Sequence, residues 1–403
     1  MPESGWSPKS VSGIFANFAV SYIGLMKIIL LGTAHPYRGG LASYNERLAG
    51  QFLSEGNDVR IYTFTLQYPE IFFPGKTQFT DKPAPEGIKI IRTLNSVNPF
   101  SWIRTGRRIK KENPDILLIK YWQPFMAPGF GTVARIAGTG GTKVICIFDN
   151  VIPHEKKLFD RLLTGYFIRS IDGAIVMSRS VGEDLAQFRT SVPVIYNPHP
   201  LFDNYGEKVP RKDALGKLGL PEDCSYLLFF GFIREYKGLD ILLKAFGDKR
   251  LREMKLKLLV AGEFYENDQP YRKLVTEAGM DDDVIFFDRF IREDEVSLFF
   301  SVADLVVQPY RSATQSGVTQ IAYHFGKPMI VTDVGGLSEI VPDGKCGYVV
   351  KPEPGEVAGA IIDFFNNERQ SFFTEGVENE RSRFTWDRLT ASILEVYRLI
   401  LKR

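Results

Sequence analysis

The sequence predicts an α/β protein made of two doubly wound domains of similar size. From Lys27 onward, short apolar runs alternate with amphipathic stretches of about 12 to 20 residues, which is typical of parallel βαβ units. The runs form two series separated by residues 197–211, where turn-forming residues are frequent and neither the helical nor the strand period is present. The length of 403 residues agrees with this division, because domains of about 150 residues are typical.

Each series contains several candidate strands. Those of the first series are residues 27–33, 59–65, 88–94, 116–122, 143–149, 173–178 and 193–197. Those of the second series are residues 226–232, 256–262, 284–290, 304–310, 328–333 and 346–350. Most of these runs are apolar along their whole length, which indicates parallel sheets covered by helices on both faces.

The predicted sheets also indicate where a ligand should bind. In doubly wound sheets, ligands bind outside the carboxyl ends of the strands. Two such domains that face each other would place both sets of strand ends around one cleft. We therefore assign residues 26–200 to a first domain and residues 201–385 to a second, and we expect the ligand site in the cleft between them.

Residues 1–25 precede the first strand and are interpreted as an N-terminal extension. The stretch from Ser10 to Met26 carries no charge, but it is shorter than the roughly 20 apolar residues of a membrane span, and polar residues interrupt it. It also lacks the basic cluster and the cleavage site of a signal peptide. A role at a membrane is the alternative interpretation of this segment.

The overall composition argues against several classes of protein. Hydrophobic residues at 44% and charged residues at 24% match a globular protein rather than a disordered or fibrous one. Fifty Lys and Arg against 48 Asp and Glu leave a net charge of +2, which argues against nucleic acid as the main partner. The three cysteines lack metal-ligand spacing, so we expect a reducing compartment, the cytoplasm.

The loop after the first strand is a candidate ligand site. Gly39 and Gly40 stand at the start of an amphipathic helix, where glycine lets a ligand approach the backbone and the helix N-terminus presents N–H groups. The spacing differs from the GxGxxG fingerprint of dinucleotide-binding proteins. An ordinary βα turn is the alternative.

The second domain repeats this arrangement with cationic side chains. Arg234 and Lys237 follow the first strand of the second series and precede a helix, and two fixed cations at that place suit a diphosphate. Solvated loop charges are the alternative. A further loop at the same predicted edge starts another helix, whose backbone amides could bind phosphate. The residues that begin this helix are Ser316, Gly317, Val318 and Thr319.

Polar residues also follow the strand at 143–149. Asp149 ends this strand and His154 lies in the following loop, so a carboxylate and an imidazole stand where the cleft is expected. A structural role is the alternative for the histidine. Asp281–Asp283 has the DxD spacing of metal-dependent sugar transfer, but it precedes a strand and so lies at the opposite edge of the sheet. We interpret it as a solvated turn and expect no metal site.

One predicted helix of the first domain is strongly basic, and Trp102 and Ile103 accompany its cations. Basic charge beside aromatic bulk can hold a protein on anionic lipid, and a solvated helix face is the alternative. The cations are Arg104, Arg107, Arg108, Lys110 and Lys111.

Over residues 26 to 403 the chain resembles the GT-B glycosyltransferases of the group 1, or family 4, type. The phrases that carry the resemblance are PYRGGLASYNERLAGQFLSEGNDVRIYT, DNVIPHE, FFGFIREYKGLDILLKAF, KPMIVTDVGGLSEIVPDGKCGYVV and FTWDRLTASILEVY. The resemblance implies a GT-B architecture of two Rossmann-like domains with a cleft between them. Residues 26–200 would form the acceptor side, residues 201–385 the nucleotide-sugar side, and a C-terminal helix at 386–403 would return to the first domain.

The resemblance also implies roles for individual residues. Gly40 would lie near the donor diphosphate and the acceptor, and Lys237 would bind the diphosphate. His154 corresponds loosely to a family histidine near the transferred sugar. These assignments describe what members of the family share at the matching positions.

Three departures from the family pattern bear on donor recognition. Asp149 stands where many members have a histidine. Phe232 replaces the usual arginine, and Arg234, two positions later, is expected to take its role. The family's two glutamates seven residues apart are absent, so donor recognition must differ. The polar side chains near their place are Gln315, Thr319 and Gln320.

We therefore expect a retaining, metal-independent hexosyltransferase that moves a sugar from a nucleoside-diphosphate sugar and needs no cofactor. The expected catalytic residues are His154, Asp149, Arg234 and Lys237. The expected donor-binding residues are Gly39, Gly40, Arg234, Lys237, Gln315, Ser316, Gly317, Val318 and Thr319.

The acceptor is not identified by the sequence. The resemblance points to polysaccharide or glycolipid synthesis, and the basic helix favours a lipid-linked acceptor and a peripheral contact with the inner face of the plasma membrane. One alternative is a sugar phosphorylase or a nucleotide-sugar epimerase on the same fold. Another is a non-catalytic GT-B binding subunit that has lost the glutamates.

Overall fold

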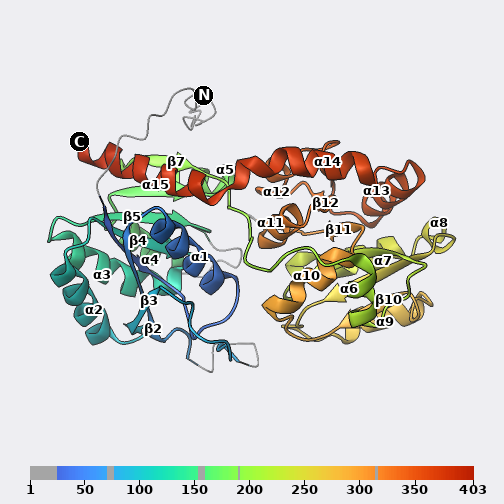
Figure 1. Ribbon diagram of the computed structural model, residues 1–403, viewed down its shortest axis with the longest axis horizontal. Coiled ribbons are helices and arrows are strands. Elements are labelled where there is room, and N and C mark those ends of the chain that lie inside the picture. The colour runs from blue at the N-terminus through green and yellow to red at the C-terminus, as the bar shows by residue number, and fades with distance from the viewer. Residues whose placement is uncertain (1–24, 70–76, 153–158, 189–190, 314–315) are drawn as a thin grey trace. The chain divides into compact units, whose positions relative to one another are not determined.

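The computed structural model describes residues 25–69, 77–152, 159–188, 191–313 and 316–403. They form two compact units, which Figure 1 shows with their labelled elements. The first unit contains the described residues up to Pro198 together with Trp386–Arg403, and the second runs from His199 to Thr385. Each unit has its own parallel sheet and its own hydrophobic core, so the α/β class expected from the sequence is confirmed.

The first unit contains a seven-stranded sheet in the order β3-β2-β1-β4-β5-β6-β7. Its strands are β1 (Lys27–Leu31), β2 (Asp58–Leu66), β3 (Lys89–Asn95), β4 (Ile116–Tyr121), β5 (Lys143–Phe148), β6 (Gly173–Val176) and β7 (Val194–Tyr196). All neighbouring strands are parallel. The order reverses between β1 and β4, because β1 pairs with β2 on one side and with β4 on the other.

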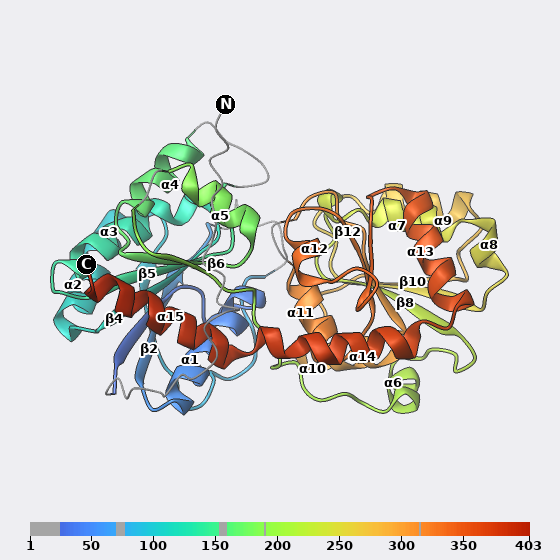
Figure 2. The same cartoon turned by 90° about the horizontal axis from the view of Figure 1, so that it is seen from above.

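Helices cover both faces of this sheet. They are α1 (Gly40–Ser54), α2 (Pro99–Glu112), η3 (Pro124–Met126), α3 (Ala127–Gly138), α4 (Asp160–Ile168), α5 (Arg179–Ala186) and α15 (Trp386–Leu401). Right-handed crossovers place α1 on one face and α2 to α5 on the other, because the β1-to-β2 connection crosses the sheet in the opposite direction to the later ones. The C-terminal helix α15 packs against β5, β6 and α1 (Figure 2).

The second unit contains a six-stranded parallel sheet in the order β10-β9-β8-β11-β12-β13. Its strands are β8 (Ser225–Phe230), β9 (Leu256–Ala261), β10 (Val284–Phe287), β11 (Leu305–Gln308), β12 (Met329–Thr332) and β13 (Gly347–Val350). Its helices are α6 (Arg211–Leu218), η4 (Glu235–Lys237), α7 (Leu239–Phe246), α8 (Lys249–Arg252), α9 (Gln269–Glu277), α10 (Glu293–Val302), α11 (Gly317–His324), α12 (Leu337–Ile340), α13 (Pro354–Asn366), α14 (Gln370–Arg381) and η5 (Ser382–Phe384).

The two sheets share one topology. The order of the six strands β8 to β13 repeats that of β1 to β6 in the other unit, with the reversal between β8 and β11. Every strand expected from the sequence is present, although β10 and β11 end earlier than the apolar runs suggested, at Phe287 and Gln308. Both sheets are doubly wound, which confirms the Rossmann-like prediction for each unit.

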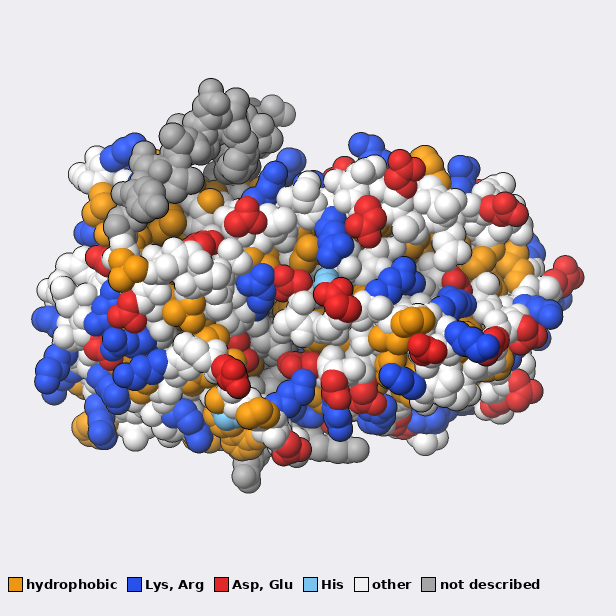
Figure 3. Space-filling view, in the orientation of Figure 1, with side chains coloured by type: hydrophobic (Ala, Val, Ile, Leu, Met, Phe, Trp, Pro, Cys, Tyr) orange, Lys and Arg blue, Asp and Glu red, His pale blue; other side chains and the backbone are white. Residues whose placement is uncertain are grey.

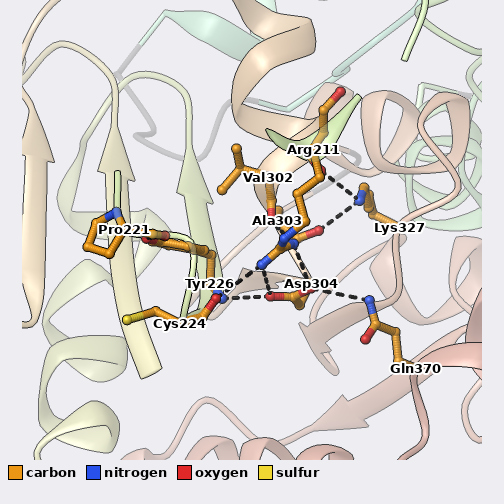
Figure 4. Close-up of polar contacts among 10 residues, drawn as sticks. Arg211, Pro221, Cys224, Tyr226, Val302, Ala303, Asp304, Lys327 and Gln370 are labelled. Atoms are coloured by element: carbon orange, nitrogen blue, oxygen red, sulfur yellow. Dashed lines mark hydrogen bonds and ion pairs between the residues drawn. The ribbon is translucent and has the colours of Figure 1, made fainter. Parts of the chain in front are cut away.

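At the amino ends of its strands, the second unit contains a cluster of charged side chains, which we call the amino-edge cluster (Figure 4). Asp304, just before β11, accepts hydrogen bonds at 2.8 and 3.0 Å from the guanidinium of Arg211. It also accepts from the backbone N–H of Tyr226 at 2.7 Å and from the amide of Gln370 at 3.3 Å. The carboxylate therefore connects α6, β8, β11 and the start of α14.

Lys327 completes the amino-edge cluster from the residues that precede β12. Its ammonium donates to the carbonyl of Ala303 at 2.8 Å and to that of Ser301 at 3.4 Å, at the C-terminal end of α10. A cation at this end of a helix interacts favourably with the helix dipole. Burial is the main cause that lowers the pKa of Lys327 to about 8.

Candidate functional site

The strongest candidate site of the second unit lies at the carboxyl ends of β8 and β11. These two strands are neighbours at the point where the strand order reverses, which is where doubly wound sheets bind ligands. The loop after β8 contains Arg234 and Lys237, and the loop after β11 leads to α11. The topology therefore brings two segments that are far apart in sequence to the same edge of the sheet.

Arg234 and Lys237 form the cationic part of this site. The guanidinium of Arg234 lies 5.0 Å from the ring centroid of Tyr265, and the ammonium of Lys237 lies 5.6 Å from that of Tyr310. Among the residues that the structure describes, neither cation forms an ion pair with a carboxylate. Burial, and to a lesser degree the charge of Arg234, lower the pKa of Lys237 to about 8.

Two glycines allow the close approach of these loops. Gly238 has φ +68°, and a Cβ there would lie 2.0 Å from the carbonyl oxygen of Pro309, so only glycine fits. A Cβ on Gly231 would lie 3.2 Å from Nζ of Lys237 and 3.6 Å from a methyl group of Val318. The β8 loop, Lys237 and the first turn of α11 therefore meet around Gly231.

The start of α11 presents its backbone rather than its hydroxyl groups. Ser316 donates its hydroxyl to Oε1 of Gln308 at 2.6 Å, and Thr319 donates to the same oxygen at 3.0 Å. Ser316 is the N-cap residue of α11, but its side chain does not cap the helix. The groups that the start of α11, from Ser316 to Thr319, can offer an anion are therefore backbone N–H groups.

Gln320 is a feature of α11 whose burial the sequence did not reveal. Its side chain is fully buried, and neither its amide nitrogen nor its amide oxygen has a hydrogen-bond partner among the described residues. The amide nitrogen of Gln308 is likewise without a partner in that part of the chain. The region in which the family's glutamates are absent therefore contains buried amide groups with unused hydrogen-bonding capacity.

The first unit presents its candidate residues at the carboxyl ends of β1, β4 and β5. Gly39 has φ +99° and precedes α1, and Gly40 is the first residue of that helix. The loop between β1 and α1 is held by the side chain of Asn45, which donates to the carbonyl of Thr33 at 2.8 Å. The helix start is therefore fixed beside the strand end, as the glycine pair suggested.

Asp149 is part of a buried ion pair that the sequence analysis missed. Its Oδ1 accepts a hydrogen bond at 2.6 Å from Lys120, which is 3% exposed. The ammonium of Lys120 also lies 3.4 Å from the ring centroid of Tyr44 on α1. Burial lowers the pKa of Lys120, and the charge of Asp149 opposes this shift. The only sequence signal was a lysine within the apolar run ILLIKYW.

Two expected site residues, His154 and Gln315, lie outside the described residues. Asp281–Asp283 lies directly before β10, at the amino edge, where Lys257 pairs with Asp283 at 2.8 Å. In the described parts of the chain, His, Cys, Asp and Glu side chains form no group of three or more that could hold a metal ion. The same residues include no helix long and apolar enough to cross a membrane.

Two family profiles match the chain. The profile described as "Glycosyltransferase Family 4" matches residues 38–201, and the one described as "Glycosyl transferases group 1" matches residues 224–367. The D-inositol 3-phosphate glycosyltransferase of Nocardioides sp. is 29% identical over 203 residues, which are 47% of this chain and 44% of that protein. The chain thus spans about half the length of the curated relatives it matches.

Solved structures are similar to almost the whole chain. The sucrose-phosphate synthase of Thermosynechococcus elongatus has a TM-score of 0.68 at 17% identity, covering 93% of this chain and 99% of that one. Anabaena HepE in complex with UDP and glucose has a TM-score of 0.68 at 14% identity, covering 92% and 98%. At such identities the similarity shows the fold, two Rossmann-like domains in the GT-B manner.

Proposed function

Because the chain belongs to the group 1 glycosyltransferases, we propose that it transfers a sugar from a nucleoside-diphosphate sugar to a hydroxyl group of an acceptor. The observation that carries this proposal is the cationic site at β8 and β11. Arg234 and Lys237 form no ion pair with any described carboxylate, and the backbone N–H groups of α11 start at the same edge. A diphosphate supplies the negative charge that this arrangement requires.

The proposed reaction breaks the bond between C1 of the sugar and the diphosphate oxygen and forms a bond from C1 to the acceptor oxygen. The acceptor proton passes to the departing diphosphate. Arg234, Lys237 and the amides of α11 stabilise the negative charge that develops on the diphosphate, and each such donor can contribute about 3 kcal/mol. These groups supply the charge stabilisation that metal-dependent enzymes obtain from a cation, so we propose a metal-independent reaction. Retention of the anomeric configuration is proposed from the family resemblance.

Asp149 is proposed to act on the sugar side of the site. Lys120 holds one of its carboxylate oxygens at 2.6 Å, so the carboxylate is kept in one orientation at the strand end. Such a group can accept a hydrogen bond from a sugar hydroxyl. His154, which lies outside the described residues, is proposed for the same region.

We propose a lipid-linked acceptor of polysaccharide or glycolipid synthesis, reached from the inner face of the plasma membrane. The support is the basic face of α2, where Arg104, Arg107 and Lys111 are exposed. Basic residues at such a position favour contact with anionic lipid.

A thermal-shift screen with UDP, GDP, ADP and dTDP, with and without EDTA, tests the donor site. UDP is the first probe, because the HepE structure contains it. A nucleotide present at 100 times its Kd should stabilise the protein by roughly 2.7 kcal/mol, which raises the melting temperature by several degrees. A selective shift that EDTA leaves unchanged supports the proposal. No shift from any nucleotide would contradict it and favour a phosphorylase or a non-catalytic subunit.

A further inference from the structure

Gln308, the last residue of β11, connects this strand to the start of α11. Its side chain is 1% exposed, and its amide oxygen accepts hydrogen bonds from both hydroxyl groups at the start of that helix. Ser316, the N-cap residue, donates to this oxygen at 2.6 Å, and Thr319, three residues later, donates to it at 3.0 Å. One buried amide therefore orients both hydroxyl groups toward the strand.

Another serine of the chain stands at the same position of a helix and behaves differently. Ser178 is the N-cap residue of α5, and its hydroxyl oxygen accepts a hydrogen bond from the backbone N–H of Val181 at 3.2 Å. A serine at this position normally satisfies an N–H group of its helix in this way. Both serines have an extended backbone, yet Ser316 caps no N–H group in the described part of the chain. The hydroxyl of Ser316 is held by Gln308 instead.

Tyr310 contacts the same hydroxyl from the loop after β11. The hydroxyl oxygens of Tyr310 and Ser316 are 3.5 Å apart, and Tyr310 is the donor, because the one hydrogen of the Ser316 hydroxyl points to Gln308. The ring centroid of Tyr310 lies 5.6 Å from the ammonium of Lys237. The buried side chains that orient Ser316 thus extend to the cationic part of the candidate site.

The amide nitrogen of Gln308 is a second, independent indication of function. It is buried, and it has no hydrogen-bond partner among the described residues. A buried donor without a partner costs free energy, and folds retain such costs most readily at functional sites. Stability alone therefore does not account for a glutamine at this position.

Specific donors are needed to select an anion in the second unit. On the face that Figure 3 shows, its cationic and acidic side chains are interspersed, so no one-sided patch of charge directs an anion there. We propose that Gln308 is a positioning residue of the diphosphate site. By holding the hydroxyl groups of Ser316 and Thr319, it leaves the N–H groups of the first turn of α11 to the diphosphate. This inference rests on the proposed transferase function.

The variant Gln308→Met tests the proposal, because methionine has a similar size and removes the acceptor. The released hydroxyl of Ser316 can then accept from the N–H of Thr319, as Ser178 accepts from Val181, and so occupy a group that the diphosphate needs. Calorimetric titration with UDP at pH 7 should give a Kd about tenfold higher than that of the wild type. GDP, ADP and dTDP replace UDP in turn if the wild type does not bind it.

Two further measurements distinguish positioning from a general loss of structure. Uridine, or the nucleoside that matches the bound nucleotide, has no phosphate and should give the same thermal shift in the wild type and in Gln308→Met. Adding Ser316→Ala removes the competing hydroxyl, so the double variant should bind UDP about fivefold more tightly than Gln308→Met alone. An equal weakening toward uridine, or no recovery in the double variant, would overturn the proposal.

Tyr323→Phe is the matched control on the same helix. The buried hydroxyl of Tyr323 donates to the carbonyl of Ile340 at 2.7 Å, so this variant also removes a buried hydrogen bond of α11, but far from the start of the helix. Its melting temperature should fall, and its Kd for UDP should stay within about twofold of the wild-type value. An equal loss of affinity in both variants would contradict the proposal. If circular dichroism shows that Gln308→Met is unfolded, Gln308→Asn replaces it, because the shorter side chain withdraws the amide oxygen from both hydroxyl groups.

The outcomes also separate this inference from the proposed function. A wild type that binds none of the four nucleoside diphosphates would overturn both. Binding that Lys237→Ala abolishes and Gln308→Met leaves unchanged would support the diphosphate site and overturn the role of Gln308.

Discussion

Each edge of the second sheet contains a lysine that is shielded from solvent, Lys327 buried and Lys237 half-buried, and the two lysines differ in their partners. At the amino edge, Lys327 donates to two backbone carbonyls, and the nearby Arg211 is paired with Asp304. At the carboxyl edge, Lys237 has neither a hydrogen-bonded carbonyl nor a carboxylate among the described residues. Both have a pKa lowered to about 8.

This difference indicates which lysine has a structural role and which one binds a ligand. A buried cation without a counter-charge costs free energy, and a fold retains it most readily where a ligand supplies the missing charge. In the amino-edge cluster each charged group has hydrogen-bond partners, so its residues hold elements together. At the carboxyl edge, Arg234 and Lys237 have no carboxylate partner among the described residues, so they are the residues we expect to bind an anion.

The largest change in stability is expected for a variant of the amino-edge cluster. Asp304→Ala removes the partner of Arg211 and of the Tyr226 N–H and should lower the free energy of unfolding by about 3 kcal/mol. Urea denaturation measures this change, and nucleotide binding should persist in the folded protein. Asp223→Ala, which breaks an exposed pair with Lys255, is the control and should cost under about 0.5 kcal/mol. Similar losses in both variants would contradict a structural role for the cluster.

For Lys237→Ala we expect a loss of activity without a loss of stability. The rate at which the enzyme releases nucleoside diphosphate from its nucleotide-sugar, identified by the thermal-shift screen, should fall about 100-fold. This loss corresponds to about 2.7 kcal/mol of transition-state stabilisation. The free energy of unfolding should stay the same or rise, because the variant removes a half-buried cation that forms no ion pair with a described carboxylate. Lys244→Ala is the control, because Lys244 is an exposed lysine that pairs with Asp240 within the same helix, α7. Near-normal turnover in Lys237→Ala would show that the loops after β8 and β11 are not the diphosphate site.

The lowered pKa of Lys237 leads to a pH dependence of binding. In the free protein the ammonium loses its proton as the pH passes about 8, whereas a bound diphosphate favours the charged form. Binding above pH 8 must then take up a proton, so UDP should bind about tenfold more weakly at pH 9 than at pH 7. Calorimetric titration at the two pH values measures the change. Lys237→Ala should be nearly insensitive over this range, and an equal dependence in that variant would assign it to another group.

The smallest effect is expected for Lys327→Met. Methionine can fill a similar volume, but the carbonyls of Ser301 and Ala303 lose their donor, so the free energy of unfolding should fall by about 1 kcal/mol. The thermal shift by UDP should equal that of the wild type. A weaker shift would mean that the two edges of the sheet are coupled, and the contrast between them would no longer hold.

The sequence by itself was sufficient to predict the architecture of each unit. The apolar runs and their two series predicted each strand that the structure contains, because burial on both faces of a parallel sheet leaves a local and periodic signal. The same reasoning assigned Arg234 and Lys237 to a strand end, since the position of a residue after a strand determines the edge on which it lies. Asp281–Asp283 was assigned to the amino edge in the same way.

Only the tertiary structure decided which charges have partners. Lys120 and Asp149 pair across 29 residues because β4 and β5 are neighbours, and no local pattern contains the strand order. The same holds for Arg211 and Asp304, which are 93 residues apart in the sequence. Strand formation depends on short-range periodicity, whereas the pairing of charges depends on which distant segments the sheet brings together.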